Sequence, residues 1–229
     1  MRQGCLAGVG IGPGDPELIT LKGYKALQNA DLIFYPVSSQ SDDVVTSFSA
    51  SILDQLELDV PCRPLLFPMT GKNRDQFYLK AYLEIKAETD RGKQVVVVSE
   101  GDILFYSTFG YLMQLANNDG IACSLIPGIP AFIAAGSCGK LPIVDGNSGL
   151  RVIAAATSFS QIQEKLKTND TLVIMKPSTL KEGWFEFLGS LQRSFLYAER
   201  VGTKLEFVTS NLEDLQYRRI PYFSLIIIY

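Results

Sequence analysis

Two short segments of this 229-residue chain carry residue types that could build a ligand site. Residues 8–16 read GVGIGPGDP, with glycine at every second position from Gly8 to Gly14. Glycine-rich turns of this kind usually bind phosphate through free backbone N–H groups. Residues 99–108 read SEGDILFYST and offer the Asp102 carboxylate, which could accept a proton, and the Tyr106 phenol, which could orient a ligand.

The first segment departs from a phosphate site at one position. A dinucleotide fingerprint needs G-x-G-x-x-G at the start of a helix, and Asp15 stands where the third glycine should be. Because Pro16 suits a first helical position, we predict that Asp15 is the N-cap of a helix over residues 17–29, so that a carboxylate already occupies the anion-attracting helix end. The glycines and Pro13 would then form a backbone-lined surface for a flat, uncharged or cationic ligand. S-adenosylmethionine, a sulfonium without phosphate, meets that description; the alternative is that the glycines only make a tight turn.

The bulk composition excludes several kinds of chemistry. The chain has no histidine, which removes Ser-His-Asp and Cys-His catalysis and His-ligated metals. The four cysteines are scattered without a C-x-x-C, so we expect reduced thiols in a cytoplasmic protein and no metal site. The net charge is −3, no Lys/Arg cluster occurs and the apolar runs are strand-sized, so neither nucleic acid nor membrane is an expected partner.

The elements that must position the two segments follow from the hydrophobic pattern. Residues 95–98 are four consecutive valines without a polar face, which is typical of a strand covered on both sides of a parallel sheet. Segments 8–16 and 99–108 each follow a strand, at the carboxyl end where ligands bind in open parallel sheets. Alternating strand-like and helix-like stretches predict an α/β domain over residues 1–125 with a mostly parallel sheet. The PGIP segment at 127–130 and the more polar stretches beyond it predict a second α/β domain over 126–229 with a mixed sheet.

Several motifs, in one order along nearly the whole chain, resemble those of the tetrapyrrole methylases. They are GIGPGDPELITLKGYKAL, ADLIFYP, SEGDILFYST, IPGIPAF and an apolar C-terminal strand. These are S-adenosylmethionine-dependent enzymes of cobalamin and sirohaem synthesis, and the second and third motifs are most similar to the precorrin-2 or cobalt-factor II C20-methyltransferases. The resemblance implies two α/β domains with an active-site cleft between them, a tetrapyrrole substrate, no protein-bound metal and a cytoplasmic homodimer.

The resemblance also implies which residues bind S-adenosylmethionine. They are Pro13, Gly101, Asp102, Ile103, Leu104, Phe105, Pro130, Ala131, Met175, Gly202 and Ser224. The chain departs from the family pattern at Ile103, where many members have proline, and at Pro130, where threonine or serine is common. Because these loops are expected to contact the cofactor mainly through backbone, we expect the pocket to persist.

The predicted catalytic residues are Asp102 and Tyr106. Asp102 could bind the pyrrole N–H groups or help the C20 proton leave, and Tyr106 could orient the macrocycle. The alternatives are a loop or cap aspartate and a packing tyrosine. Basic residues could contact the carboxylates of the substrate, although each could equally be solvated surface. These residues are Arg151, Lys176, Arg200 and Lys204.

Other functions stay open on the sequence alone. Methyl transfer from a sulfonium needs an aligned, electron-rich acceptor more than a strong base, so the absence of histidine is no obstacle. The acceptor could be uroporphyrinogen III or a later corrin, or the elongation-factor histidine modified by diphthine synthase. A Rossmann oxidoreductase and a non-catalytic tetrapyrrole carrier are the alternatives of a different class. The substrate could be free of cobalt, as precorrin-2 is, or could already contain it.

Overall fold

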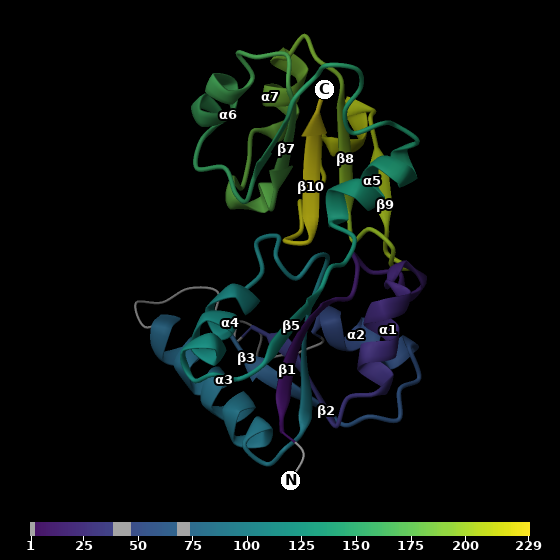
Figure 1. Ribbon diagram of the computed structural model, residues 1–229. Helices are drawn as coiled ribbons and strands as arrows, with labels where there is room; N and C mark the ends of the chain where they lie inside the picture. Colours follow the sequence, from purple (N-terminus) through teal and green to yellow (C-terminus); the bar gives the residue numbers. More distant parts are fainter. Residues whose placement is uncertain (1–2, 39–46, 68–73) are drawn as a thin grey trace. The chain divides into compact units, whose positions relative to one another are not determined.

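The computed structural model describes residues 3–38, 47–67 and 74–229. The chain divides into two compact units, residues 1–130 and 131–229, each built around its own five-stranded sheet (Figure 1). The PGIP segment, residues 127–130, ends the first unit.

The sheet of the first unit is parallel throughout, where the sequence predicts a mostly parallel one. Its strands are β1 (Cys5–Gly10), β2 (Leu32–Val37), β3 (Cys62–Leu66), β4 (Gln94–Ser99) and β5 (Cys123–Ile126). The spatial order is β3-β2-β4-β1-β5. Gly10 pairs with Ser99 and Val9 with Ile126, so β1, β4 and β5 end at the same edge of the sheet.

Helices cover both faces of this sheet (Figure 1). They are α1 (Leu21–Gln28), α2 (Phe48–Gln55), α3 (Arg74–Thr89) and α4 (Phe109–Asn118). Val95 and Val97 belong to the core shared with α3 and α4, whereas Val96 and Val98 belong to the core shared with α1 and α2. Both sides of β4 are therefore buried, which confirms the interpretation of the valine run.

The predicted helix over residues 17–29 is wrong in its first part. Pro16–Leu18 is a 3₁₀ turn, and the chain is extended at Ile19 and Thr20 before α1 begins. Asp15 is a cap, since its carboxylate accepts a hydrogen bond from Glu17 N–H at 2.9 Å, but it caps only the 3₁₀ turn. The Thr20 hydroxyl caps α1 by accepting from Gly23 N–H at 3.0 Å. The Asp15 carboxylate therefore lies beside the glycine turn and does not occupy the end of a long helix.

The second unit contains the mixed sheet that the sequence predicts. Its strands are β6 (Leu150–Ile153), β7 (Thr171–Met175), β8 (Phe195–Glu199), β9 (Phe207–Thr209) and β10 (Ser224–Ile228). They lie in the order β6-β7-β10-β8-β9, with β6 and β7 parallel and the remaining pairs antiparallel.

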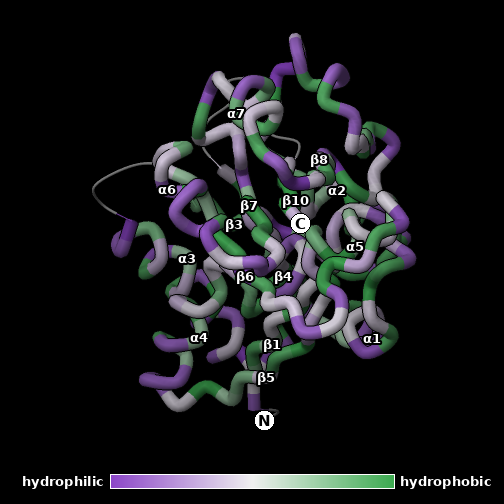
Figure 2. Tube along the Cα trace, turned by 90° about the horizontal axis from the view of Figure 1, so that it is seen from above, coloured by the Kyte–Doolittle hydropathy of each residue, from purple (hydrophilic) through white to green (hydrophobic). Residues whose placement is uncertain are grey.

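Three helices accompany this second sheet: α5 (Ala131–Gly139), α6 (Phe159–Lys165) and α7 (Trp184–Ser190). Side chains of α6 and α7 form one core with Tyr197 and Ile226 of the sheet. Helix α5 contacts β8 and β9 and is coloured hydrophobic to neutral along its length (Figure 2). In the ranges that the structure describes, no helix combines the length and apolarity of a membrane span.

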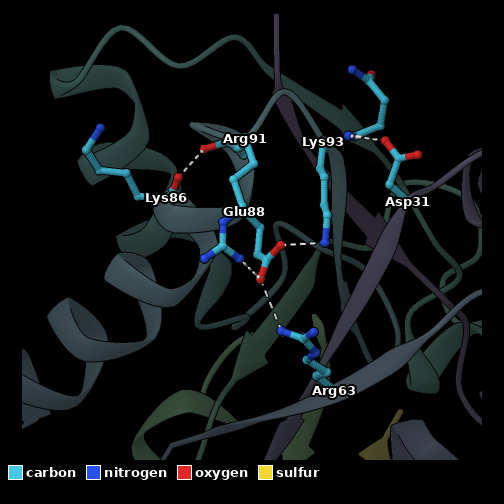
Figure 3. A network of polar contacts seen from close by, with 8 residues as sticks. Asp31, Arg63, Lys86, Glu88, Arg91 and Lys93 are labelled. Atoms are coloured by element: carbon cyan, nitrogen blue, oxygen red, sulfur yellow. Dashed lines mark hydrogen bonds and ion pairs between the residues drawn. The ribbon is translucent and has the colours of Figure 1, made fainter. Parts of the chain in front are cut away.

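A buried carboxylate joins three segments at the other edge of the first sheet (Figure 3). Glu88, near the end of α3, has a side chain that is only 6% exposed. Its oxygens lie 2.6 Å from Lys93 Nζ, 3.0 Å from Arg91 Nη1 and 3.1 Å from Arg63 Nη1. Lys93 above all, with Arg91 and Arg63, holds the pKa of Glu88 below its usual value against the opposing effect of burial.

We expect Glu88→Gln to lower the melting temperature at pH 7 by a few degrees, because it removes the charge that three cations neutralise. The folded-state pKa of Glu88 is lowered. The contribution of its charge to the free energy of unfolding is therefore complete above the unfolded-state pKa of about 4.3 and disappears as pH falls through the folded-state pKa. Thermal unfolding of the wild type and of Glu88→Gln between pH 7 and pH 2 should show the difference in melting temperature disappearing in acid. The exposed Glu84→Gln on the same helix is the control. A difference in melting temperature that is constant across this pH range would contradict the assignment of Glu88 as an ionised partner of the three cations.

Candidate functional site

The carboxyl ends of β1, β4 and β5 meet through three glycine backbones, Gly10, Gly101 and Gly128, called here the glycine junction. A Cβ on Gly128 would lie 2.1 Å from Gly101 O and 2.8 Å from Gly10 C and O. A Cβ on Gly10 would lie 2.6 Å from Gly128 N and 2.7 Å from Gly101 O. Backbone atoms cannot yield to such contacts, so only glycine fits at positions 10 and 128.

A two-way backbone bridge joins the two segments that the sequence singled out. Gly101 N–H donates to Gly12 O at 2.7 Å, and Gly12 N–H donates to Gly101 O at 3.2 Å. Both glycines have positive φ, +80° at Gly12 and +66° at Gly101, which other residues adopt with strain. The turn containing Pro13 and the loop starting at Gly101 are therefore brought together in the first unit.

The expectation that all four glycines of residues 8–14 line a ligand surface is wrong for two of them. A Cβ on Gly8 would meet the Phe109 ring at 2.5 Å and the Ile103 side chain at 2.9 Å, so Gly8 makes room for core packing. Gly10 makes room for the other backbones of the glycine junction. Gly12 and Gly14, which flank Pro13, remain as candidates for a ligand contact, and all three residues are buried in the structure.

Asp102 connects the loop after β4 to the PGIP segment. Its Oδ2 accepts from Gly128 N–H at 2.8 Å, and its Oδ1 accepts from Leu104 N–H at 2.9 Å. Both carboxylate oxygens thus bind backbone N–H groups of the protein. This arrangement holds the loop in place across the glycine junction.

The remaining loop residues differ in what they can offer a ligand. The Ile103 side chain is fully buried in the core shared with α4, so only its backbone is available. Leu104 is 59% exposed and Tyr106 is 54% exposed. The rings of Phe105 and Tyr106 pack edge to face with centroids 4.7 Å apart. Tyr106 has φ +54°, a strained backbone that is common at functional positions.

One contact to this loop could not be found from the sequence. Ser49 of α2 is fully buried and its hydroxyl donates to Glu100 Oε1, directly before Gly101. The partners are 51 residues apart, and Ser49 belongs to none of the motifs. The contact ties α2 to the start of the loop.

Three of the predicted cofactor residues converge at one end of the second sheet. Met175 ends β7 and pairs with Leu225, while Ser224 starts β10 and pairs with Glu199 of β8. Gly202 lies in the turn after β8, where its N–H donates to Glu206 Oε2 at 2.7 Å. The Ser224 hydroxyl donates to Pro221 O.

Two further predicted cofactor residues, Pro130 and Ala131, are adjacent in the chain, where the first unit ends and the second begins. Ala131 is the first residue of α5.

Glu199, at the end of β8, is a buried carboxylate that is already neutralised. Arg218 donates to it twice, Nε to Oε2 at 3.1 Å and Nη2 to Oε1 at 2.8 Å, and the Tyr197 hydroxyl donates to Oε2. Burial works against ionisation, but these hydrogen bonds hold the pKa of Glu199 below its usual value. Glu199 is therefore an ionised partner of Arg218 and a poor base at neutral pH.

Comparison with known proteins identifies the family. The model of the Tetrapyrrole (Corrin/Porphyrin) Methylases matches residues 5–216. The chain belongs to this family. The resemblance read from the glycine turn and the SEGDILFYST segment is thereby confirmed.

Individual relatives and a solved structure agree with this assignment. The precorrin-2 C(20)-methyltransferase of a Sinorhizobium species is 32% identical, over 98% of this chain and 95% of its own length. The cobalt-precorrin-2 C(20)-methyltransferase of Salmonella typhimurium is 27% identical, over 99% of this chain and 96% of its own length. The uroporphyrin-III C-methyltransferase of Thermus thermophilus, solved in complex with S-adenosylhomocysteine, has a TM-score of 0.69 at 19% identity, over 98% of this chain and 96% of its own. This last likeness shows that the two tetrapyrrole methylases share a fold.

Proposed function

We propose that the protein transfers a methyl group from S-adenosylmethionine to C20 of precorrin-2 or cobalt-precorrin-2, a step of cobalamin biosynthesis. The observation that carries this proposal is the match, across 98% of the chain, to a precorrin-2 C(20)-methyltransferase. The Salmonella relative acts on the cobalt-containing substrate, so the presence of cobalt stays open.

The residues at the carboxyl edge of the first sheet fit the methyl donor. Gly12–Gly14 and the Gly101–Phe105 loop present mostly backbone, and the Asp15 carboxylate beside the turn suits a cation better than a phosphate. S-adenosylmethionine supplies an activated methyl group on a positively charged sulfur. The protein's part is then to hold donor and acceptor in line, which accounts for chemistry without histidine.

Within this site, Tyr106 is the proposed substrate-orienting residue, because its ring is exposed at the end of the loop. Asp102 acts by positioning, since both of its oxygens are engaged by Gly128 and Leu104. That Pro13, Pro130 and the second-unit residues Ala131, Met175, Gly202 and Ser224 contact the cofactor stays a prediction.

A homodimer in the cytoplasm is proposed on the family resemblance alone. Light scattering on the purified protein should give twice the 25.2 kDa mass of the chain. A monomer mass would remove the homodimer from the proposal and leave the methyl transfer standing.

The reaction itself can be tested directly. The protein is incubated with S-adenosylmethionine carrying a ¹³C-labelled methyl group and with precorrin-2, in the presence and absence of cobalt, and the label is located by NMR. We expect the label at C20. Label at another ring carbon would make the protein a different tetrapyrrole methylase. No transfer, together with no calorimetric binding of S-adenosylhomocysteine, would overturn the proposal.

A further inference from the structure

Five non-glycine residues in the described part of the chain have a left-handed backbone: Glu57, Tyr106, Lys140, Lys176 and Arg200. Glu57 and Lys140 stand directly beyond α2 and α5, where a left-handed residue commonly ends a helix. At Lys140 the hydrogen bonds that close such a helix end are also present: Lys140 N–H donates to Ser137 O, and Leu141 N–H donates to Gly136 O. Lys176 and Arg200 do not end helices: each follows a β-strand and opens a turn, in which Lys176 O accepts from Thr179 N–H and Arg200 O accepts from Thr203 N–H.

Lys176 and Arg200 flank the start of β10. Lys176 N–H donates to Ser224 O at 3.1 Å, and Arg200 N–H donates to Phe223 O at 2.9 Å. Their φ angles are 52° and 49°. Since β7 and β8 lie on either side of β10, two strand spacings place the two Cα atoms roughly 10 Å apart. The backbone thus holds two cationic residues at one end of the second sheet.

The protein compensates the charges of this pair only in part, since the charge of Arg200 helps to lower the pKa of the neighbouring Glu199 carboxyl. No ion pair joins Lys176 or Arg200 to a carboxylate within the described residues, and Lys176 Nζ lies 4.9 Å from the centroid of the Tyr222 ring. The carboxylate next to Arg200 in sequence, Glu199, is already bound by Arg218. Each residue is half-buried, so an anion bound to it would be partly shielded from water.

The other two basic candidates from the sequence differ from this pair, Arg151 in its ion pair and Lys204 in its exposure. Arg151 Nε lies 2.7 Å from Asp170 Oδ2, at the opposite end of β7. Lys204 is exposed in the turn after β8. The structure therefore narrows four candidates to Lys176 and Arg200.

We propose that Lys176 and Arg200 are specificity-determining residues that bind carboxylate side chains of the tetrapyrrole. The inference rests on the proposed function, whose substrates carry several carboxylates. The left-handed backbone is easiest for glycine and strained for lysine and arginine, so the backbone alone would be better served by glycine at both positions. The cationic side chains must then be kept for a contact of their own. A backbone held in place also limits the directions of both side chains before substrate arrives, which favours binding.

The test replaces each residue by glycine, alone and together. Lys176→Gly and Arg200→Gly remove the charge but keep the backbone conformation accessible, so the melting temperature should be equal to or above that of the wild type. Because hydrogen bonds to charged groups are among the stronger ones, we expect the KM for precorrin-2 to rise roughly 10-fold for each single variant and further for the double variant. The kcat and the Kd for S-adenosylhomocysteine should stay within about twofold of wild type. A residue that binds the substrate equally well in the ground state and in the transition state changes KM without changing kcat. Raising the salt concentration should weaken substrate binding by the wild type more than by the double variant.

Lys140→Gly is the matched control, because it changes the same residue type at nearly the same φ, 53°, beyond a helix. Its KM should equal that of the wild type. A folded double variant with the wild-type KM would overturn the inference and leave the proposed function intact, whereas a wild type that methylates no tetrapyrrole would overturn the proposed function itself. Loss of S-adenosylhomocysteine binding in the double variant would also overturn the inference, since the pair would then serve the cofactor. Should a glycine variant not fold, asparagine, which tolerates the same backbone, takes its place with the same expectations.

Discussion

Gly128→Ala should largely abolish methyl transfer and destabilise the first unit. The added Cβ would lie 2.1 Å from Gly101 O and 2.8 Å from Gly10 C and O. These are backbone atoms of loops anchored in the sheet, so they can move only if the carboxyl ends of β1, β4 and β5 separate. Overpacking of this kind costs about 3 kcal/mol of unfolding free energy. A displacement of about 1 Å in the loop that positions the reactants is enough to lower kcat/KM roughly 100-fold.

The measurement pairs thermal unfolding with the methyl-transfer assay. Gly110→Ala is the control, because a Cβ at Gly110 in α4 meets no atom within 4 Å. That variant should keep full activity and gain about 0.5–1 kcal/mol of stability, as expected for alanine in place of glycine inside a helix. If Gly128→Ala and Gly110→Ala had the same stability and the same activity, the close backbone contact at Gly128 would contribute to neither.

The fold could be predicted from the sequence wherever one local pattern decided the outcome. The valines at 95–98 had to be buried on both sides, and the structure places them between two helical layers. The predicted helix over 17–29 failed because its one residue of low helix propensity, Gly23, lies inside α1, whereas the interruption falls at two residues that do not break helices. The interruption at Ile19 and Thr20 is visible only as an extended backbone, although Thr20 is a good N-cap residue and offered a signal that could have been used.

The candidate site was predictable in its location but not in its contacts. The sequence predicts that segments 8–16 and 99–108 each follow a strand of a mostly parallel sheet, and in the structure a bridge joins Gly12 to Gly101 at that edge. That Gly8 makes room for Phe109 depends on packing between segments about 100 residues apart, which no motif encodes. The left-handed backbone of Lys176 and Arg200 was equally inaccessible, since neither residue type favours it.

The hydrogen bond from Gly128 N–H to Asp102, which no motif predicts, helps to distinguish two roles for Asp102 that the sequence left open, a positioning residue and a proton acceptor. As a positioning residue, Asp102 holds the loop after β4 by accepting from Gly128 N–H and Leu104 N–H. Asp102→Ala leaves both donors without their partner, and we expect kcat/KM to fall roughly 100-fold and the Kd for S-adenosylhomocysteine to rise roughly 10-fold. Asp102→Asn keeps one acceptor oxygen and should recover about half of each loss on a logarithmic scale.

A proton acceptor would give a different pattern from a positioning residue. Asparagine cannot accept a proton in this range, so Asp102→Asn and Asp102→Ala would lose kcat equally, with unchanged affinity for S-adenosylhomocysteine and an altered pH profile of kcat. Isothermal titration and turnover between pH 5 and pH 9 distinguish the two, with the exposed Asp59→Asn as a control that should change neither quantity. The geometry favours the first pattern, because each oxygen of the Asp102 carboxylate already accepts a backbone N–H bond, which fixes the carboxylate between Gly128 and Leu104 and leaves one lone pair per oxygen for any further contact.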